Sequence, residues 1–206
     1  MPAAPSDSVL ILGIGNLLWA DEGFGPRCVE ALAESHAFGP GVRLLDGGTQ
    51  GLYLLPFLEG MGSLLVFDAV DYGLAPGTLK IVRDDEVPAF MGAKKMSLHQ
   101  TGFQDVLATA AFKGCLPARM TLIGCQPAEL EDYGGGLTAI AAAQIGPAIA
   151  AGLAELAAWG VEVRPGRTDT HDLADPALRR DAYEGGRPSE TDACRIGDAR
   201  FFPGAG

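Results

Sequence analysis

Short apolar runs that alternate with helical patterns constrain the fold of this chain more than any other feature of its sequence. Residues 9–14 (VLILGI) form a continuous apolar run that is followed directly by a glycine. Similar runs occupy residues 42–45, 64–69, 78–82 and 120–125. Strands of a parallel sheet have this pattern because helices cover both of their faces. The runs therefore predict five strands.

Helical patterns lie between the predicted strands. From Phe24 the apolar residues recur at i, i+4, i+7 and i+8, which predicts an amphipathic helix with Pro26 in its first turn. Further helical patterns occupy residues 52–58, 103–110 and 137–159, and residues 161–163 predict a short edge strand. This alternating order, with crossovers long enough for helices, predicts an α/β fold with a mostly parallel, helix-covered sheet.

Polar residues gather just after three of the predicted strands. They are residues 16–22, residues 46–50 and Asp68, which ends the strand LLVFD. Ligands of open α/β sheets bind beyond the carboxyl ends of the strands. The sequence therefore predicts a functional site at this edge of the sheet.

The character of the chain changes at Pro165. The residues that follow carry many charges of both signs and no sustained apolar period. We therefore predict a domain over residues 1–164 and a disordered or loosely docked tail over residues 165–206.

Composition limits the partners and the compartment. The net charge of −11 disfavours nucleic acids and anionic membranes, which would repel the chain. No 18-residue window is uninterruptedly apolar, and the Ala-rich residues 137–159 contain Gln144, Pro147 and Glu155, so we expect no membrane insertion. The first residues, MPAAPSDS, lack the basic and apolar regions of a signal peptide. Four scattered cysteines favour a reducing cytoplasm over a disulfide framework.

The turn after the first strand only partly resembles a nucleotide-binding loop. GIGNLL supplies two glycines of a GxGxxG pattern, but Leu18 takes the place of the third. The next polar residues, Asp21 and Glu22, would repel a pyrophosphate. We expect the glycines to serve the sharp turn, and Asp21 to cap the following helix.

Glu22 has two possible companions for a metal site. Asp68 ends an apolar strand, where a buried carboxylate is costly unless it is paired or bound to a metal. His99 lies in MSLHQTG, just before a helical pattern. Two carboxylates and one imidazole on separate loops could hold a metal with open positions, although a hydrogen-bonded structural role for His99 is the alternative.

Five sequence blocks carry a resemblance to a known family. GIGNLLWADEGFG, DGGTQG, LLVFDAVDYG, MSLHQTG and GCQPAELEDYGG occur in this order and resemble the hydrogenase maturation proteases, most closely the subgroup for uptake, membrane-bound hydrogenases. The resemblance runs from about residue 9 to residue 163, and the chain beyond residue 164 has no counterpart in it. It implies a three-layer sandwich, in which a twisted, mostly parallel sheet of about five strands is covered by helices on both faces.

The resemblance also implies a function. Members of the family are endopeptidases that remove the C-terminal peptide from the large-subunit precursor of a nickel–iron hydrogenase. Their metal ligands fall on Glu22, Asp68 and His99. The nickel is understood to belong to the precursor, so that the enzyme recognises the loaded metal before it cleaves. The cut is expected after a His or Arg that follows the last metal-binding cysteine motif of the substrate.

Several further residues are weaker candidates for substrate binding. Asp46 either accepts amide hydrogen bonds within its own loop or contacts the substrate. Gly48 and Thr49 are expected to open a helix, with peptide docking as the second interpretation. Gln100 is expected to support its neighbour His99.

The catalytic group is not identified by the sequence. No GxSxG motif occurs, and Cys125 has no evident base partner. Members of the family have been grouped with aspartic-type peptidases, but the chain has no pair of DTG-like motifs. Water activated by a metal or by a carboxylate remains as two alternatives.

Two other functions compete with the endopeptidase. One is a non-enzymatic module that binds a metal or a nucleotide and holds a protein partner. The other is a metal-dependent aminopeptidase or related hydrolase, although such sites usually show ligands for two metals. The combination of Glu22, Asp68 and His99 favours the endopeptidase.

Overall fold

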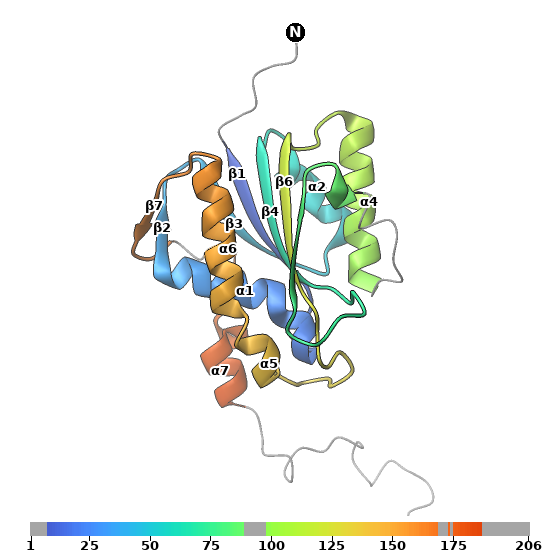
Figure 1. The fold of residues 1–206 in the computed structure, drawn as a ribbon, viewed down its shortest axis with the longest axis vertical. Coiled ribbons are helices and arrows are strands. Elements are labelled where there is room, and N and C mark those ends of the chain that lie inside the picture. Colours follow the sequence, from blue (N-terminus) through green and yellow to red (C-terminus); the bar gives the residue numbers. More distant parts are fainter. Residues whose placement is uncertain (1–7, 89–97, 169–172, 174, 187–206) are drawn as a thin grey trace, which may run out of the picture.

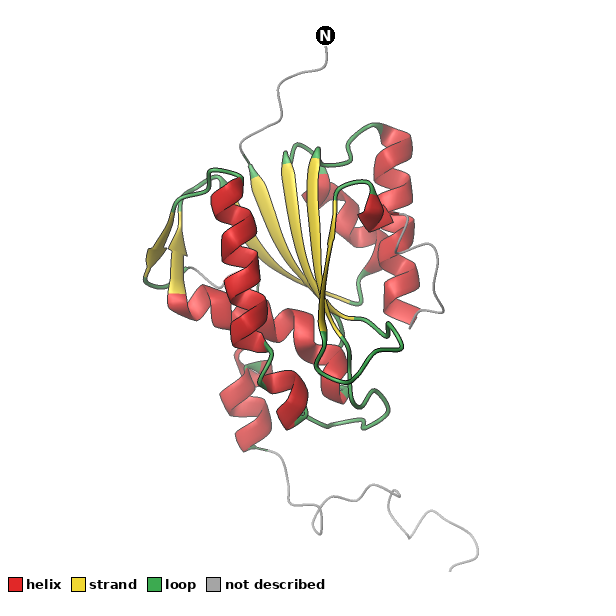
Figure 2. Cartoon of the chain, in the orientation of Figure 1, coloured by secondary structure: helices red, strands yellow, loops and turns green. Residues whose placement is uncertain are grey.

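The computed structural model describes residues 8–88, 98–168, 173 and 175–186, with the backbone alone for residues 98–101. Figure 1 shows a central sheet with helices on both of its faces. The same layers stand out by secondary structure in Figure 2. This arrangement confirms the predicted α/β fold.

The sheet has five strands in the order β3-β1-β4-β6-β5. Their bounds are β1 Val9–Ile14, β3 Val42–Gly48, β4 Ser63–Ala69, β5 Leu79–Arg83 and β6 Arg119–Cys125. The neighbouring pairs among β3, β1, β4 and β6 are parallel, whereas β5 runs antiparallel to β6 at the edge. The carboxyl ends of four strands therefore meet at one edge of the sheet.

Helices cover the two faces of the sheet and divide the core into two clusters. Helices α1 (Phe24–Ser35) and α6 (Ile145–Ala158) pack on one face, where Phe24 and Phe67 are fully buried. Helices α2 (Leu55–Leu58) and α4 (Leu98–Lys113) pack on the other face, where Phe103 is buried. The central strands carry apolar side chains on both faces because helices cover both faces of the sheet.

The predicted helix over residues 137–159 is divided in the structure. Helix α5 (Ala139–Ala142) begins at Thr138, whose hydroxyl accepts the N–H of Ala141, and α6 starts after Gln144. Helix α5 is one turn long, and Pro147 lies in the first turn of α6, where its missing N–H removes no helical hydrogen bond.

By length and hydropathy alone, the stretch Ala139–Ala158 is a candidate membrane span, with a mean hydropathy of 1.5. In the structure 28% of the stretch is buried, and α6 packs on the sheet. A Cβ atom added to Gly152 would lie 2.8 Å from the Phe67 ring, so the small residue allows this close approach. Core helices often have such a composition, and the absence of membrane insertion stays a prediction.

A second, two-stranded sheet lies beside the main one. Strand β2 (His36–Phe38) pairs antiparallel with β7 (Val163–Pro165). The predicted edge strand at residues 161–163 therefore starts two residues later and joins β2 instead of the main sheet. Strand β2 was not predicted, since three residues that follow a helix carry too little pattern.

Part of the predicted tail contacts the domain. A 3-10 helix, η3 (Pro176–Leu178), and helix α7 (Arg180–Gly185) lie near α1. Earlier in the chain, Thr168 donates its N–H to the carbonyl of Ala33 at 2.8 Å. The division of the chain at residue 165 stays a prediction, but the contacts of this segment matter for the site described next.

Candidate functional site

The turn after β1 brings Glu22 back to the carboxyl edge of the sheet. Glu22 lies in the 3-10 helix η1 (Ala20–Gly23), and η1 contacts β4. Gly15 has a φ of +139°, and a Cβ atom there would lie 1.8 Å from the carbonyl oxygen of Glu22. Only glycine allows this conformation and this close approach. The glycines thus serve the turn that presents Glu22, as the sequence predicted.

Asp68 lies on the neighbouring strand at the same edge. It is the penultimate residue of β4 and is fully buried. Gly25, at the start of α1, passes so close to β4 that an added Cβ atom would lie 2.2 Å from the Phe67 carbonyl oxygen. The first turn of α1, the preceding η1 helix with Glu22, and Asp68 are therefore packed together. Glu22 is partly buried, and this burial raises the pKa of its carboxyl group.

His99 lies in the first turn of α4, and its side chain is outside the described part of the structure. The backbone nevertheless places this end of α4 near the same edge. A Cβ atom added to Gly102 would lie 3.2 Å from the Cα of Gly51, and Gly51 begins the η2 helix shortly after β3 ends. Among the residues with described side chains, no group of three metal-binding side chains is found. The shared site of Glu22, Asp68 and His99 thus stays a prediction.

The prediction that Asp21 caps the helix was wrong. Neither η1 nor α1 has a side-chain cap. Asp21 is instead fully buried and accepts the N–H groups of Ala128 and Glu129, at 2.8 and 3.1 Å. It also accepts the N–H and the hydroxyl of Thr138, at 2.7 and 3.0 Å. Asp21 therefore ties the Glu22 turn to the loop that follows β6.

Gln126 organises the loop after β4, a role that the sequence did not reveal. Its Oε1 atom accepts the N–H groups of Tyr72 and Leu74, at 2.7 and 3.1 Å, and its Nε2 atom donates to Asp71 at 3.0 Å. Gln126 is buried and directly follows β6. A polar residue right after a buried strand, in the block GCQPAELEDYGG, was the only available signal.

The loop that Gln126 holds places Tyr72 over the strand next to Asp68. A Cβ atom added to Gly124 would lie 1.8 Å from the Tyr72 hydroxyl oxygen, and Gly124 pairs with Asp68 across β4 and β6. Burial, and secondarily the negative charge of Asp68, raise the pKa of the Tyr72 hydroxyl far above its usual value. The Tyr72 hydroxyl therefore stays protonated at physiological pH.

Two aromatic side chains pack together next to the Glu22 turn. Trp19 packs edge to face on Tyr133, with ring centres 5.2 Å apart. Their backbones form an isolated antiparallel bridge, and Tyr133 is 66% exposed. An exposed aromatic surface therefore lies close to Glu22, whose N–H donates to the carbonyl of Trp19 at 2.9 Å.

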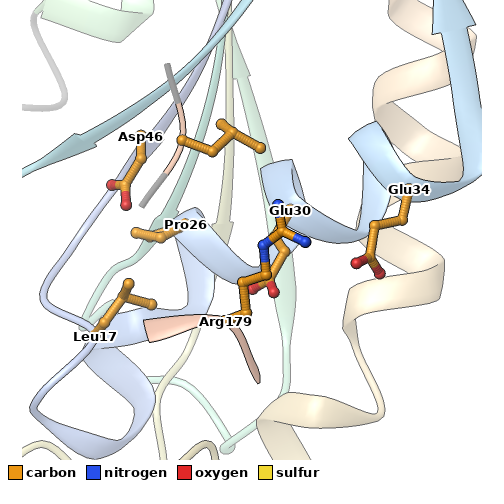
Figure 3. A pocket seen from close by; sticks show the side chains of 7 residues that line it. Leu17, Pro26, Glu30, Glu34, Asp46 and Arg179 are labelled. Carbon is orange, nitrogen blue, oxygen red and sulfur yellow. The ribbon is translucent and has the colours of Figure 1, made fainter. Parts of the chain in front are cut away.

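Asp46 lies in a separate pocket between β3, α1 and two C-terminal residues, Leu173 and Arg179. The pocket has an empty volume of about 360 Å³, including the open space at its mouth. Its lining residues, shown in Figure 3, are Leu17, Pro26, Glu30, Glu34, Asp46, Leu173 and Arg179. The Asp46 Oδ1 atom accepts the N–H of Gly48 at 2.9 Å. Burial raises the pKa of Asp46, while the Gly48 N–H and the charge of Arg27 lower it.

Gly48 and Thr49 do not open a helix as expected, whereas the expected role of Gln100 stays a prediction. Gly48 ends β3 with a φ of +47° and does not open a helix, which begins only at Gly51. Thr49 lies in an exposed turn. Gln100 lies in α4, and its side chain is outside the described residues. The Asp46 side chain accepts the Gly48 N–H in the same turn.

The two buried cysteines, Cys28 and Cys125, do not resemble catalytic thiols. Burial, reinforced by Asp21, raises the pKa of Cys125 to about 12, and Cys125 is 1% exposed. Burial likewise raises the pKa of Cys28. A nucleophilic cysteine needs a thiolate in an accessible, electropositive environment. Cys125 is therefore a core residue, in agreement with the missing base partner in the sequence.

The comparison with known sequences identifies the family. A sequence model of the family described as hydrogenase maturation protease matches residues 26–155. The hydrogenase expression/formation protein HupD of Rhodobacter capsulatus is 69% identical over 205 residues, which cover 100% of this chain and 98% of the relative. The hydrogenase 2 maturation protease of Escherichia coli is 44% identical over 165 residues, or 80% of this chain and 99% of the relative.

The match to HupD also corrects one expectation. It extends over the whole chain, so the residues beyond 164 do have a counterpart in a relative. The shorter E. coli protein leaves about a fifth of this chain unmatched. The C-terminal residues are therefore shared with longer relatives such as HupD.

Solved structures agree with the sequence matches. The hydrogenase maturating endopeptidase HybD from E. coli has a TM-score of 0.73 and 43% sequence identity, and the match covers 77% of this chain and 97% of that protein. The [NiFe] hydrogenase maturation protease HybD from Thermococcus kodakarensis has a TM-score of 0.60 at 27% identity, covering 72% of this chain and 98% of that protein. The chain belongs to the hydrogenase maturation protease family, whose members are endopeptidases.

Proposed function

We propose that this protein removes a C-terminal peptide from the nickel-loaded large-subunit precursor of a nickel–iron hydrogenase. The observation that carries the proposal is the arrangement of Glu22 and Asp68 on two packed elements at the carboxyl edge of the sheet. The [NiFe] hydrogenase maturation protease of Thermococcus kodakarensis, at 27% identity, supports a nickel–iron hydrogenase as the partner.

We propose that the nickel belongs to the substrate. We propose that Glu22, Asp68 and His99 bind it while the precursor supplies the remaining ligands. Two carboxylates and one imidazole fit the donor set, because nickel accepts mixed nitrogen and oxygen ligands and three protein ligands leave positions open. The burial of Asp68 and the raised pKa of Glu22 fit as well, since a cation would relieve the cost of holding two acids in a poorly solvated place.

The three proposed ligands come from three elements that the sheet fixes independently. Glu22 depends on the Gly15 turn and on the Asp21 hydrogen bonds, Asp68 on the buried strand β4, and His99 on α4. A site built on a rigid scaffold distinguishes a loaded precursor from an empty one by the contacts that the metal completes. This gives the enzyme a check on metal insertion before the irreversible cleavage.

The peptide to be cut would run past the aromatic and polar groups around this site. We propose that Asp46, with Gly48 and Thr49 in its loop, contacts the precursor peptide, and that Gln100 supports His99. Water is the proposed nucleophile, because the described buried cysteines are protonated thiols. We also propose that the protein works in the reducing cytoplasm, where its cysteines would stay unpaired.

The direct test mixes the purified protein with nickel-loaded and nickel-free large-subunit precursor. Intact-mass spectrometry then shows whether the large subunit was shortened and at which bond. Shortening of the loaded precursor alone supports the proposal. Binding of the precursor without any cleavage would instead support a non-enzymatic holding module.

A further inference from the structure

Large apolar side chains that stay exposed gather at the carboxyl edge of the sheet. They are Leu52 and Tyr53 after β3, Leu74 after β4, and Tyr133 and Ile140 after β6. Elsewhere in the described part of the chain, the exposed large apolar side chains are Ile81 and Phe112. A concentration of exposed apolar side chains on one part of a surface is typical of a protein-binding region.

The backbone fixes Tyr133 beside Glu22. The N–H of Gly134, next to Tyr133, donates to the carbonyl of Leu18 at 2.7 Å, and Trp19 and Tyr133 form the isolated bridge and the edge-to-face contact described above. The carbonyl of Trp19 accepts the N–H of Glu22 at 2.9 Å. The Tyr133 ring is therefore already ordered next to a proposed nickel ligand, and a partner that binds it loses little conformational entropy.

Tyr53 occupies a matching position beside the start of α4. Its neighbour Leu54 is 1% exposed and anchors η2 (Gly51–Leu54) in the core cluster that contains Phe103 of α4. Leu52 and Tyr53 face solvent and are 55% and 82% exposed. The first turn of α4 passes close to Gly51 of the same short helix.

The two tyrosines thus belong to opposite faces of the sheet. Tyr133 lies next to the turn that leads into α1, and Tyr53 lies next to α4, which covers the other face. In Figure 1 the loop after β6 and helix α5 lie beside the start of α1. Exposed aromatic rings therefore flank the carboxyl edge on both sides, with Glu22 and Asp68 between the two faces.

The charge of these segments limits what can bind there. Residues 15–23, 49–54, 70–78 and 126–138, which follow the four parallel strands, contain carboxylates but neither Lys nor Arg. Glu129 and Glu131 are exposed close to Tyr133 in the same loop, whereas Lys80, which follows these segments, lies over the Tyr72 ring at 5.2 Å. Aromatic rings among carboxylates complement a surface with apolar side chains next to Lys or Arg, through burial, cation–π contacts and ion pairs.

We propose that Tyr53 and Tyr133, with Leu52, Glu129 and Glu131, form a docking surface for a part of the large-subunit precursor that presents apolar side chains beside Lys or Arg. The proposal rests on the proposed function, since the precursor is the partner. Contacts on both sides of the edge would hold the precursor while its nickel reaches Glu22 and Asp68. Tyrosines in such positions often supply a large share of the binding energy of an interface.

The first test compares Tyr53→Ala and Tyr133→Ala with Phe112→Ala in the full-length protein. Phe112 is a matched control, because it is an aromatic residue that is 93% exposed but lies near the C-terminal end of α4, at the opposite edge of the sheet. Biolayer interferometry measures the affinity for nickel-free precursor, which should stay uncleaved, and steady-state cleavage gives KM for the nickel-loaded precursor. We expect each tyrosine variant to weaken binding and to raise KM by about 10-fold. Phe112→Ala should match the wild type.

The second test addresses the charge of the partner. Glu131→Gln removes an exposed carboxylate near Tyr133, and Glu162→Gln removes an equally exposed one in front of β7, away from this edge. We expect Glu131→Gln to weaken precursor binding a few-fold at low ionic strength, with a smaller difference at high salt. Glu162→Gln should bind as the wild type does at both salt concentrations. Equal affinities of these two variants would contradict a cationic partner surface.

Tyr53→Ala keeps the proposal falsifiable if the loss of Tyr133 disturbs the Glu22 turn through Trp19. Precursor affinity and KM of folded Tyr53→Ala equal to those of Phe112→Ala would overturn the docking surface. If the wild-type protein binds the precursor without cleaving it, the proposed function fails, whereas the affinities still decide whether this surface docks the precursor. If it cleaves the loaded precursor and all variants have the wild-type KM, the docking surface alone is wrong.

Discussion

Asp21 and Thr138 are separated by 117 residues, yet Asp21 accepts both the N–H and the hydroxyl of Thr138, at 2.7 and 3.0 Å. Thr138 in turn caps α5, because its hydroxyl accepts the N–H of Ala141 at 3.2 Å. One buried carboxylate thus joins the turn before α1 to the start of α5. The geometry of the Glu22 turn depends on this long-range link.

Asp21→Asn should therefore destabilise the protein markedly. An amide group replaces one carboxylate oxygen by a donor, which would face N–H or hydroxyl donors now bound to Asp21. Loss of such buried hydrogen bonds typically costs about 1–3 kcal/mol. Chemical denaturation measures the change, with the exposed Asp105→Asn as the control. Equal stability of the two variants would show that the Asp21 links contribute little.

Gly124→Ala should disturb the loop beside Asp68. The new methyl group would overlap the Tyr72 hydroxyl and its ring, so the ring must move or the strand must shift. Overpacking of this kind typically costs about 1–3 kcal/mol. Gly146→Ala is the control, because an added Cβ atom in that helix meets open space. The additional change Tyr72→Leu should restore part of the lost stability, and failure to do so would point to a different cause.

The pair of Arg83 and Glu155 should make stability depend on pH. Hydrogen bonding to Arg83 lowers the pKa of Glu155 below its ordinary value of 4.5, and the Thr121 hydroxyl contributes to the shift. A lowered pKa in the folded state stabilises the protein above the unfolded value, and this contribution is lost as pH falls through the folded value. Glu155→Gln should therefore be less stable than the wild type at pH 7. The difference should vanish at strongly acidic pH, and a constant difference would contradict this linkage.

Removal of residues 173–206 should destabilise the domain, contrary to the small effect that composition alone suggests. Arg27 would lose the Leu178 carbonyl and the Tyr183 ring, and Glu30 would lose the Arg180 N–H. A buried charge with fewer partners costs about 1–3 kcal/mol or more. Removal of residues 187–206 alone, which leaves these contacts in place, is the control. Equal unfolding midpoints for the two truncations would mean that the segment is only loosely docked.

The elements of the main sheet could be predicted because their signals are local. The bounds of β1 were predicted without error, and the start of α1 at Phe24 follows from its apolar period. The antiparallel direction of β5 and the pairing of β2 with β7 could not be predicted, since both depend on contacts between distant parts of the chain.

The site shows the same division between local and long-range information. The positions of Glu22 and Asp68 at the carboxyl edge of the sheet were predicted from the apolar strands that they follow or end. Asp21 was misjudged because an acid before a helix is typical of a cap, whereas its actual partners are more than 100 residues away. The burial of Arg27 gave no signal either, because its partners Leu178 and Tyr183 are about 150 residues away.

Cleavage of nickel-loaded precursor by folded Glu22→Gln, Asp68→Asn and His99→Ala variants tests the central claim most directly. Nickel affinity is measured beside it, and circular dichroism confirms that each variant folds. Each change removes one proposed metal ligand, so we expect each to reduce the cleavage rate by about 100-fold or more, beyond the 10- to 100-fold typical of groups that only support a ligand. Control reactions with nickel-free precursor should show no cleavage by any form of the enzyme. Full activity of the Asp68→Asn or His99→Ala variant on the loaded precursor would contradict the shared nickel site.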